Sequence, residues 1–269
     1  MHHSKISTFL AAIVRLVEGH GGGMHYYIDG NTYVGTGADV DSEIDPAIGS
    51  IQRLWNWDGF YYTNWDDSTL VINSPNMACG SPGTPYAVSP HAPITAGSVV
   101  AINYTLPGSN PPWSFGHPIG PMLAYMAACP DSGCESVDTK KALWFKIWQA
   151  GLEYGNYVEG KWAMRDVFEG GNQNIPIPKT LKGGKYLLRH EMINLQSGPV
   201  QFFPNCVQLD VKSEGSSLPK EEELVAFPSV YDANSGTSWP GQKEGSEWFY
   251  TKHGKDTVYP MPGPSIWGG

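Results

Sequence analysis

The stretch KYLLRHEMINL, residues 185–195, alternates apolar and polar side chains along most of its length. This period of two predicts a β-strand with one face in a hydrophobic core. Short apolar runs, separated by turn signals such as SPG, PGSNPP and KGG, recur along the rest of the chain. They are MHYYIDG (24–30), NTYVG (31–35), TLVIN (69–73), SVVAINYTL (98–106), PMLAYMAA (121–128), LWFKIW (143–148) and VQFFPNCVQLDV (200–211). Many short strands joined by turns predict an all-β fold, an antiparallel sandwich.

The composition agrees with this fold and limits the function. The 269 residues include 32 Gly and 22 Pro, which argues against a helix bundle. Only 16% of the residues are charged, and the net charge is −9. Such an acidic chain lacks the basic face that phosphate contacts need, so we expect no nucleic-acid partner. A charge-poor chain with 10 Trp, 14 Tyr and 9 Phe is typical of secreted proteins that contact carbohydrate.

The sequence changes character after the last predicted strand. Residues 212–223, KSEGSSLPKEEE, form a charged connector, and residues 224–269 are rich in Pro, Gly, Trp and Tyr. Strand signals are few in this part of the chain. We therefore expect one domain over residues 20–269, in which residues 212–269 are an extended tail that packs on the sandwich.

Residues 1–19 are interpreted as a secretory signal peptide. The apolar run Ile6–Val14 is far shorter than the roughly 20 residues that cross a bilayer. Val17 and Gly19 suit the −3 and −1 positions of a cleavage site, and an ordinary amphipathic helix is the alternative. No later stretch is apolar enough to span a membrane, so we expect a secreted, extracellular protein without a membrane partner. In such a protein the sequon NYT at Asn103 is a candidate glycosylation site.

Four cysteines, an even number, suit an oxidising compartment. Cys129 and Cys134 lie in the short polar turn AACPDSGCE, which a local disulfide could close. Cys79 and Cys206 would then form a long-range disulfide. Four free thiols or a metal cluster are the alternatives, although the chain lacks the C-x₂-C pair typical of zinc sites.

Cleavage after Gly19 would make His20 the first residue of the mature chain. An N-terminal histidine offers an α-amine and an imidazole nitrogen that can chelate one metal ion. A second imidazole would complete a nitrogen-rich set, which favours copper. The candidates for this second ligand are His25, His91, His117, His190 and His253. His117 is the best of them, because the Gly/Pro-rich loop WSFGHPIGPMLAY can present an imidazole at the surface.

Eight motifs, in order along the chain, resemble one family. They are HGGGMHYYIDG (20–30), SIQR (50–53), CGSPGTP (79–85), GHPIGPMLAYMAAC (116–129), CESVD (134–138), LRHEMINL (188–195), QFFPNCVQLDV (201–211) and YPMPGP (259–264). The ordered set resembles the fungal lytic polysaccharide monooxygenases of auxiliary activity family 9, over nearly all of the chain after Gly19.

The resemblance implies an immunoglobulin-like β-sandwich with long loops and a flat substrate face. It implies one copper ion held by His20 and His117, and the disulfides Cys79–Cys206 and Cys129–Cys134. The reaction implied is oxidative cleavage of insoluble β-glucan, cellulose or a hemicellulose, at C1 or C4. It needs a small-molecule or protein reductant as electron donor, with hydrogen peroxide or dioxygen as co-substrate. A monomer is expected.

At three positions near the implied copper site, the residue can be compared with the one usual in the family. Gln201 matches a glutamine that the family places beside the copper, and we expect it to act in catalysis. Phe203 stands where the family usually has an axial tyrosine, and a phenyl ring cannot donate an oxygen ligand. Gln196 stands nearest to a usual histidine, and an amide cannot deliver a proton as imidazolium does. We expect altered redox behaviour and a retained metal site.

Aromatic side chains are expected to bind the flat faces of pyranose rings. The candidates are Tyr259, Tyr250 and Trp65, of which Tyr259 is the best, and core packing is the alternative for each. Two further functions compete with the monooxygenase. One is a non-catalytic copper- or glycan-binding protein of the same fold. The other is a glycoside hydrolase, which needs two positioned carboxylates that the acidic residues of this chain do not indicate.

Overall fold

The computed structural model describes residues 21–37, 40–55, 60–61, 74–105, 114–141, 143–196, 200–231 and 247–269. Four expectations lie outside these residues: the signal peptide, His20, Trp65 and the predicted strand TLVIN (69–73). Over the described ranges, no helix has both the length and the apolar character needed to cross a membrane.

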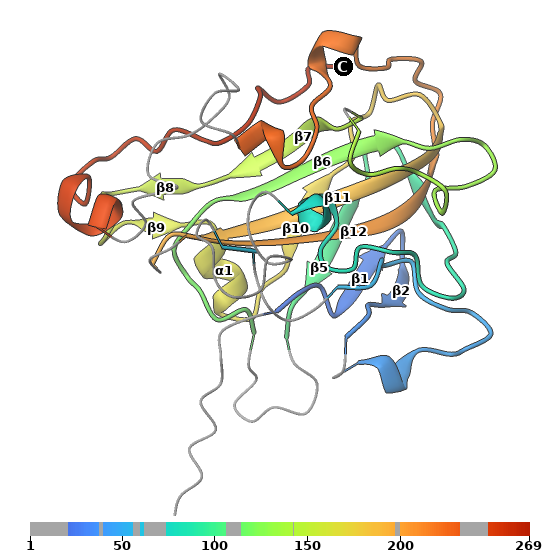
Figure 1. The fold of residues 1–269 in the computed structure, drawn as a ribbon, viewed down its shortest axis with the longest axis horizontal. Coiled ribbons are helices and arrows are strands. Elements are labelled where there is room, and N and C mark those ends of the chain that lie inside the picture. Colours follow the sequence, from blue (N-terminus) through green and yellow to red (C-terminus); the bar gives the residue numbers. More distant parts are fainter. Residues whose placement is uncertain are drawn as a thin grey trace, which may run out of the picture.

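Two sheets pack face to face in the described part of the chain (Figure 1). The small sheet has the order β10 (Gln173–Pro176), β5 (Val99–Asn103), β1 (His25–Ile28), β2 (Asn31–Val34). The large sheet has the order β3 (Phe60–Tyr61), β12 (Gln201–Lys212), β11 (Gly184–Asn194), β6 (Met122–Ala128), β7 (Phe145–Ala150). Its sixth strand, β4 (Ala92–Thr95), also pairs with β12. A separate hairpin joins β8 (Leu152–Tyr154) to β9 (Lys161–Trp162).

Short helices fill the connections between these strands. They are η1 (Asp41–Glu43), η3 (Pro75–Ala78), α1 (Met164–Phe168), η4 (Glu221–Glu223), η5 (Ser229–Tyr231) and the π-helix η6 (Glu247–Lys252). The prediction of a β-sandwich is confirmed. Among the described strands, the pairing of β4 with β12 over Leu209–Lys212 is parallel, in contrast to the antiparallel pairing of the others.

The core between the sheets is built from alternate residues of the facing strands. Tyr26, Val100 and Ile102 of the small sheet are fully buried in one cluster with Leu188 and Val207 of the large sheet. Because successive side chains of a strand point to opposite faces, the intervening residues must lie on the outer face of the large sheet.

That outer face is buried as well, so the prediction that residues 185–195 have only one face in a core is wrong. Arg189 and Glu191 of β11 are both fully buried, and they form a two-bonded ion pair of 2.9 and 2.6 Å. The Phe227 ring lies 3.6 Å from the Arg189 guanidinium, and the Tyr231 hydroxyl donates to Glu191. The polar side chains of the strand therefore face a second layer of protein, supplied by residues far along the chain.

The last part of the chain contacts the strand at the edge of the large sheet. The backbone of Val225 exchanges two hydrogen bonds with Trp144, of 3.1 and 2.8 Å. Further on, Lys146 of β7 donates from Nζ to the Pro262 carbonyl oxygen at 2.6 Å. The ring of Trp267 packs edge-to-face on Phe145, with 5.2 Å between centroids. Each of these contacts joins the described residues after position 212 to the sandwich.

Lys146 should make the protein more stable at alkaline pH. Burial lowers the pKa of Lys146 from 10.5 to about 7, despite the opposing effect of Glu191. Between pH 7 and 10 the unfolded chain therefore binds one more proton at this residue than the folded chain does. The free energy of unfolding should rise with pH in this window, by at most about 1.4 kcal/mol per pH unit from this group.

Urea unfolding at pH 7 and pH 9 tests this expectation. Lys146→Met should remove the rise with pH, while Lys255→Met, at an exposed position, should keep it. An equal pH dependence in wild type and Lys146→Met would show that another group causes it.

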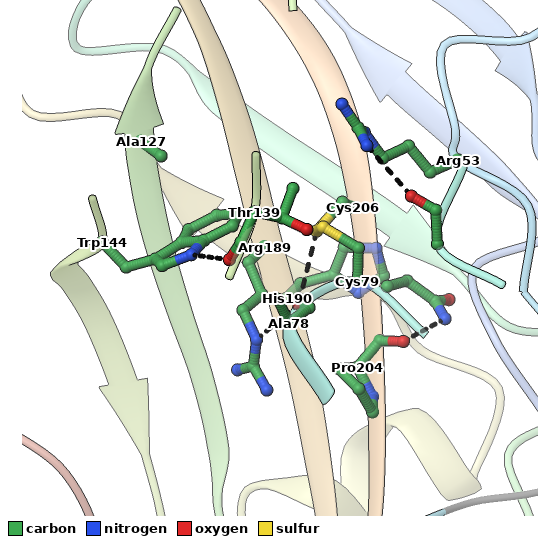
Figure 2. Close-up of a disulfide and its surroundings, with 12 residues drawn as sticks. Arg53, Ala78, Cys79, Ala127, Thr139, Trp144, Arg189, His190, Pro204 and Cys206 are labelled. Carbon is green, nitrogen blue, oxygen red and sulfur yellow. Dashed lines mark hydrogen bonds between the residues drawn. A yellow bond between two sulfur atoms is a disulfide. The ribbon is translucent and has the colours of Figure 1, made fainter. Parts of the chain in front are cut away.

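The structure contains both disulfides that the resemblance implies. Cys79–Cys206 joins the end of η3 to β12, and Cys129–Cys134 closes the turn after β6. Figure 2 shows the first of them, with the Arg189 guanidinium donating to the Ala78 carbonyl oxygen at 2.8 Å. This contact and the disulfide hold the same short helix against the large sheet.

Candidate functional site

The expected site residues lie at one end of the large sheet. Asn194, the last residue of β11, pairs with Gln201, the first residue of β12. Met192 of β11 pairs with Met122, which begins β6, so the loop before β6 lies at this end too. The register of three strands thus gathers residues from three separate sequence motifs.

The loop that carries His117 is fixed at both of its ends. The Ser114 hydroxyl donates to the Val167 carbonyl oxygen of α1 at 2.7 Å. On the other side, Gly120 has a φ of +148°, and a Cβ there would lie only 1.8 Å from the Ile193 carbonyl oxygen. Any side chain at position 120 would push the loop away from β11, so the glycine allows the close approach.

Two phenyl rings pack against the His117 imidazole. Its centroid lies 5.6 Å from the Phe115 ring and 5.9 Å from the Phe203 ring. The two phenyl rings contact each other edge-to-face at 5.2 Å. Phe203 is 7% exposed, while His117 is half-buried. The structure thus brings together His117 and Phe203, and the apolar rings limit access of water to one side of the imidazole.

Gln201 lies on the same face of β12 as Phe203, two residues earlier. Its Oε1 accepts a hydrogen bond of 2.6 Å from Asn194 Nδ2. Asn194 Oδ1 in turn accepts from the backbone N–H of Gln196 at 2.9 Å. The structure therefore joins the two expected residues Gln196 and Gln201 through Asn194, which our sequence analysis missed. The signal was a lone polar residue in the apolar run MINL, opposite Gln201.

The residues that follow His20 are held against the same strand. The backbone N–H of Gly23 donates to Asn205 Oδ1 at 2.9 Å, and Asn205 lies two residues beyond Phe203 on the same face of β12. A Cβ on Gly22 would lie 2.4 Å from Asn205 Oδ1 and 2.6 Å from the Trp55 ring. The run of glycines in HGGGM thus allows the chain to pass between a strand and an indole. Sequence analysis missed Asn205 as well.

The other candidate histidines are held elsewhere by hydrogen bonds. Their partners are Glu43 for His25 (3.0 Å), the backbone N–H of Cys134 for His91 (3.1 Å), the hydroxyls of Tyr26 and Tyr104 for His190 (3.0 and 2.8 Å) and Asp256 for His253 (2.7 Å). Burial, helped by Arg189, lowers the pKa of His190 to about 3, so this imidazole is neutral. Of the five candidates, His117 is the one that packs against Phe203.

Of the two expected metal ligands, His20 and His117, the described residues include His117. Within the described ranges, no group of three or more His, Cys, Asp or Glu side chains could hold a metal ion. His20, which precedes the buried residue Gly21 in the sequence, is the expected source of the other two nitrogen donors.

Comparison with known proteins gives the family. The model of auxiliary activity family 9, formerly glycoside hydrolase family 61, matches residues 20–240. The chain belongs to auxiliary activity family 9.

Its relatives in this family are named lytic polysaccharide monooxygenases. The monooxygenase-like protein CEL1 of Agaricus bisporus is 32% identical over 97% of this chain and 75% of its own length. Monooxygenase B of Heterobasidion irregulare is 31% identical over 94% and 93%. The crystal structure of HiLPMO9B superposes with a TM-score of 0.74 at 29% identity, covering 93% of this chain and all of that one. A cellulose-active polysaccharide monooxygenase from M. thermophila gives a TM-score of 0.70 at 25% identity, with coverage of 93% and 100%.

The aromatic residues that we expected to bind substrate differ in exposure. Tyr250, in η6, is 40% exposed and borders an open cavity of about 700 Å³. Tyr259 is only 8% exposed, and its ring packs edge-to-face on Trp162 and Tyr157, at 5.0 and 5.5 Å between centroids. In this member of the family, the described contacts of Tyr259 are packing contacts, and its role toward substrate stays a prediction.

Asn103 ends β5 near the beginning of β1, where it pairs with His25. Its side-chain Oδ1 accepts from the backbone N–H of Thr105 at 3.0 Å, and its Nδ2 donates to Asn172 Oδ1 at 3.2 Å. Nδ2 also donates to Thr105 Oγ1 at 3.4 Å. Glycosylation at this half-buried amide stays a prediction, and a glycan on Nδ2 would replace one of its two donated bonds.

Proposed function

We propose that this protein is a secreted, copper-dependent lytic polysaccharide monooxygenase that cleaves β-glucan, cellulose in particular, by hydroxylation at C1 or C4. The observation that carries the proposal is the packing of His117 against Phe203, on the strand face that also holds the glycines after His20. Residues 1–19 are the signal peptide in this proposal, and residues 20–269 are the monooxygenase domain.

The residues present suit a copper ion. Gly23 is anchored to Asn205, which lies two positions beyond Phe203 along the strand, a distance of about 7 Å. Three residue steps from Gly23 back to His20 can span up to about 10 Å, and this length supports His20 as the proposed partner of His117. The α-amine and imidazole of His20 with the imidazole of His117 would give three nitrogen donors, a set that favours copper.

Copper, when bound, supplies the one-electron chemistry that activates hydrogen peroxide or dioxygen. The chain's own residues shape the surroundings. Phe203 offers no oxygen ligand, and it keeps one side of the site apolar. Gln201 supplies a side-chain amide, whose Oε1 accepts from Asn194. Gln196, nearest to the position where the family usually has a proton-carrying histidine, donates its backbone N–H to Asn194. The helix η6 lies at the end of the molecule beyond β8 and β9 (Figure 1). Its exposed residue Tyr250 is the proposed contact for a pyranose ring.

Product analysis tests the proposal. Incubation with amorphous cellulose, copper, ascorbate and hydrogen peroxide should release oligosaccharides oxidised at C1 or C4, seen by mass spectrometry. Omission of ascorbate, or removal of copper with a chelator, should abolish these products. Tight copper binding without oxidised products from any glucan would instead favour the non-catalytic binding protein, the function that Phe203 and Gln196 motivate.

A further inference from the structure

The hydrogen bonds next to Phe203 allow only one orientation of the Gln201 carboxamide. A backbone N–H can only donate, so the Asn194 atom that lies 2.9 Å from the backbone nitrogen of Gln196 must be the acceptor Oδ1. The other branch of the Asn194 amide, the donor Nδ2, therefore lies 2.6 Å from Gln201. The atom of Gln201 that faces Nδ2 must then be the acceptor Oε1.

The position of the pair makes this orientation stable. Asn194 is fully buried at the end of β11, directly opposite Gln201, which is 7% exposed. Water cannot replace either partner easily there, and a buried amide without its hydrogen bonds would cost free energy. A reversed Gln201 amide would place two donors, its Nε2 and Asn194 Nδ2, against each other.

We infer that Asn194 is a positioning residue that orients the Gln201 carboxamide. Oε1 is held toward Asn194, so Nε2, with its two N–H groups, is the branch turned away from Asn194 on the strand face that carries Phe203. An N–H donor at this place can hydrogen-bond an oxygen atom of hydrogen peroxide or dioxygen. An amide carbonyl oxygen can only accept, so it could not bond an oxygen atom that carries no proton. This inference rests on the proposed function, since it assigns the polarity of the same site.

The orientation has a chemical consequence at this site. Phe203 has no hydroxyl group, and Gln196 has no imidazolium to donate a proton. The Nε2 of Gln201 is a donor on the same strand face as Phe203. Its direction is set by two hydrogen bonds, one from Asn194 to Gln201 and one from the Gln196 backbone N–H to Asn194. Asn194 acts through Gln201 and needs no contact of its own with the co-substrate.

The variant Asn194→Asp reverses the polarity with almost no change of shape. One carboxylate oxygen still accepts from the Gln196 N–H, but the other cannot donate to Gln201. Gln201 must rotate so that Nε2 donates to the introduced carboxylate and Oε1 turns outward. In metal-free protein labelled with ¹⁵N, the Gln201 side-chain amide protons should shift downfield from their wild-type positions, because they then donate to a charged carboxylate. Gln201→Glu, which removes these signals, assigns them.

The second variant keeps the test decisive if Asn194→Asp does not fold. Gln201→Glu leaves an oxygen for Asn194 Nδ2 but places an acceptor where the donor was. The Asn194 side-chain amide signal should keep its slow exchange in this variant. With copper present, either variant should retain copper binding and release oxidised products about tenfold more slowly than wild type.

Unchanged Gln201 amide signals in Asn194→Asp, or loss of the slow Asn194 signal in Gln201→Glu, would overturn the inference. The nuclear magnetic resonance readout uses metal-free protein, so it stands apart from the proposed function. A wild-type protein that makes no oxidised product would refute the monooxygenase, while the amide signals would still report whether Asn194 orients Gln201.

Discussion

Replacement of His117 by alanine should weaken copper binding more than any other single change at a described residue. The imidazole is one of three proposed nitrogen donors, and even residues that only orient a metal ligand change affinity by about 10- to 100-fold. We expect a loss greater than about 100-fold on that scale. Isothermal titration in competition with a chelator measures the affinity, and electron paramagnetic resonance reports the number of bound nitrogens.

The matched control is His253→Ala. His253 is also a partly exposed histidine, but it pairs with Asp256 at 2.7 Å and belongs to no described contact around Phe203. Its removal should leave copper affinity unchanged. A chain extended by one residue before His20 should behave like His117→Ala, because the extension masks the α-amine. Wild-type affinity in His117→Ala would mean that another imidazole holds the metal.

The β-sandwich and the proximity of His117 to Phe203 could both be predicted from the sequence. Strand periodicity and turn residues depend on neighbours along the chain, so they predicted most strands of both sheets, but not the short strands β3, β4 and β10. The loop around His117 could be recognised from its Gly/Pro-rich sequence, although the contact that requires Gly120 is with Ile193, far along the chain. The family resemblance implied that the motifs carrying His117 and Phe203 both lie near the copper site, and the structure places these two residues in contact.

The parts that were missed depend on contacts across long sequence distances. Asn194 gained its role only through the register that places it opposite Gln201. The outer face of β11 looked solvent-exposed because its alternate residues, Arg189 and Glu191, are charged. They are buried because residues such as Phe227 return to cover them, and periodicity carries no record of such a covering segment.

Tyr259 shows the same limit in another way. An aromatic residue in a Pro-rich segment suits both a sugar-binding surface and a packed tail. The burial of its ring between Trp162 and Tyr157 was decided by the hairpin of β8 and β9, whose two strands come about 100 residues earlier. Exposure, unlike strand type, is a property of the assembled molecule.

Loss of the Cys79–Cys206 disulfide should cause the largest fall in stability. It links residues 127 apart, and both cysteines are buried. In the chain-entropy account a loop of this length contributes about 5 kcal/mol, since the cross-link restricts the unfolded chain. The double variant Cys79→Ala/Cys206→Ala should therefore melt roughly 10–20 °C below wild type, by the usual scaling for a chain of this size. Scanning calorimetry under non-reducing conditions measures this shift.

The second disulfide is the matched control within the same protein. Cys129 and Cys134 are only five residues apart, for which the same account gives about 2 kcal/mol. Cys129→Ala/Cys134→Ala should thus lower the melting temperature by less than half as much. Equal losses in the two variants would show that loop length does not govern the effect. Because Cys206 lies three residues after Phe203 on β12, the long-range disulfide also ties the strand of the proposed copper site to η3. A larger loss for Cys79–Cys206 would mean that the strand carrying the site depends on a cross-link that only an oxidising compartment maintains.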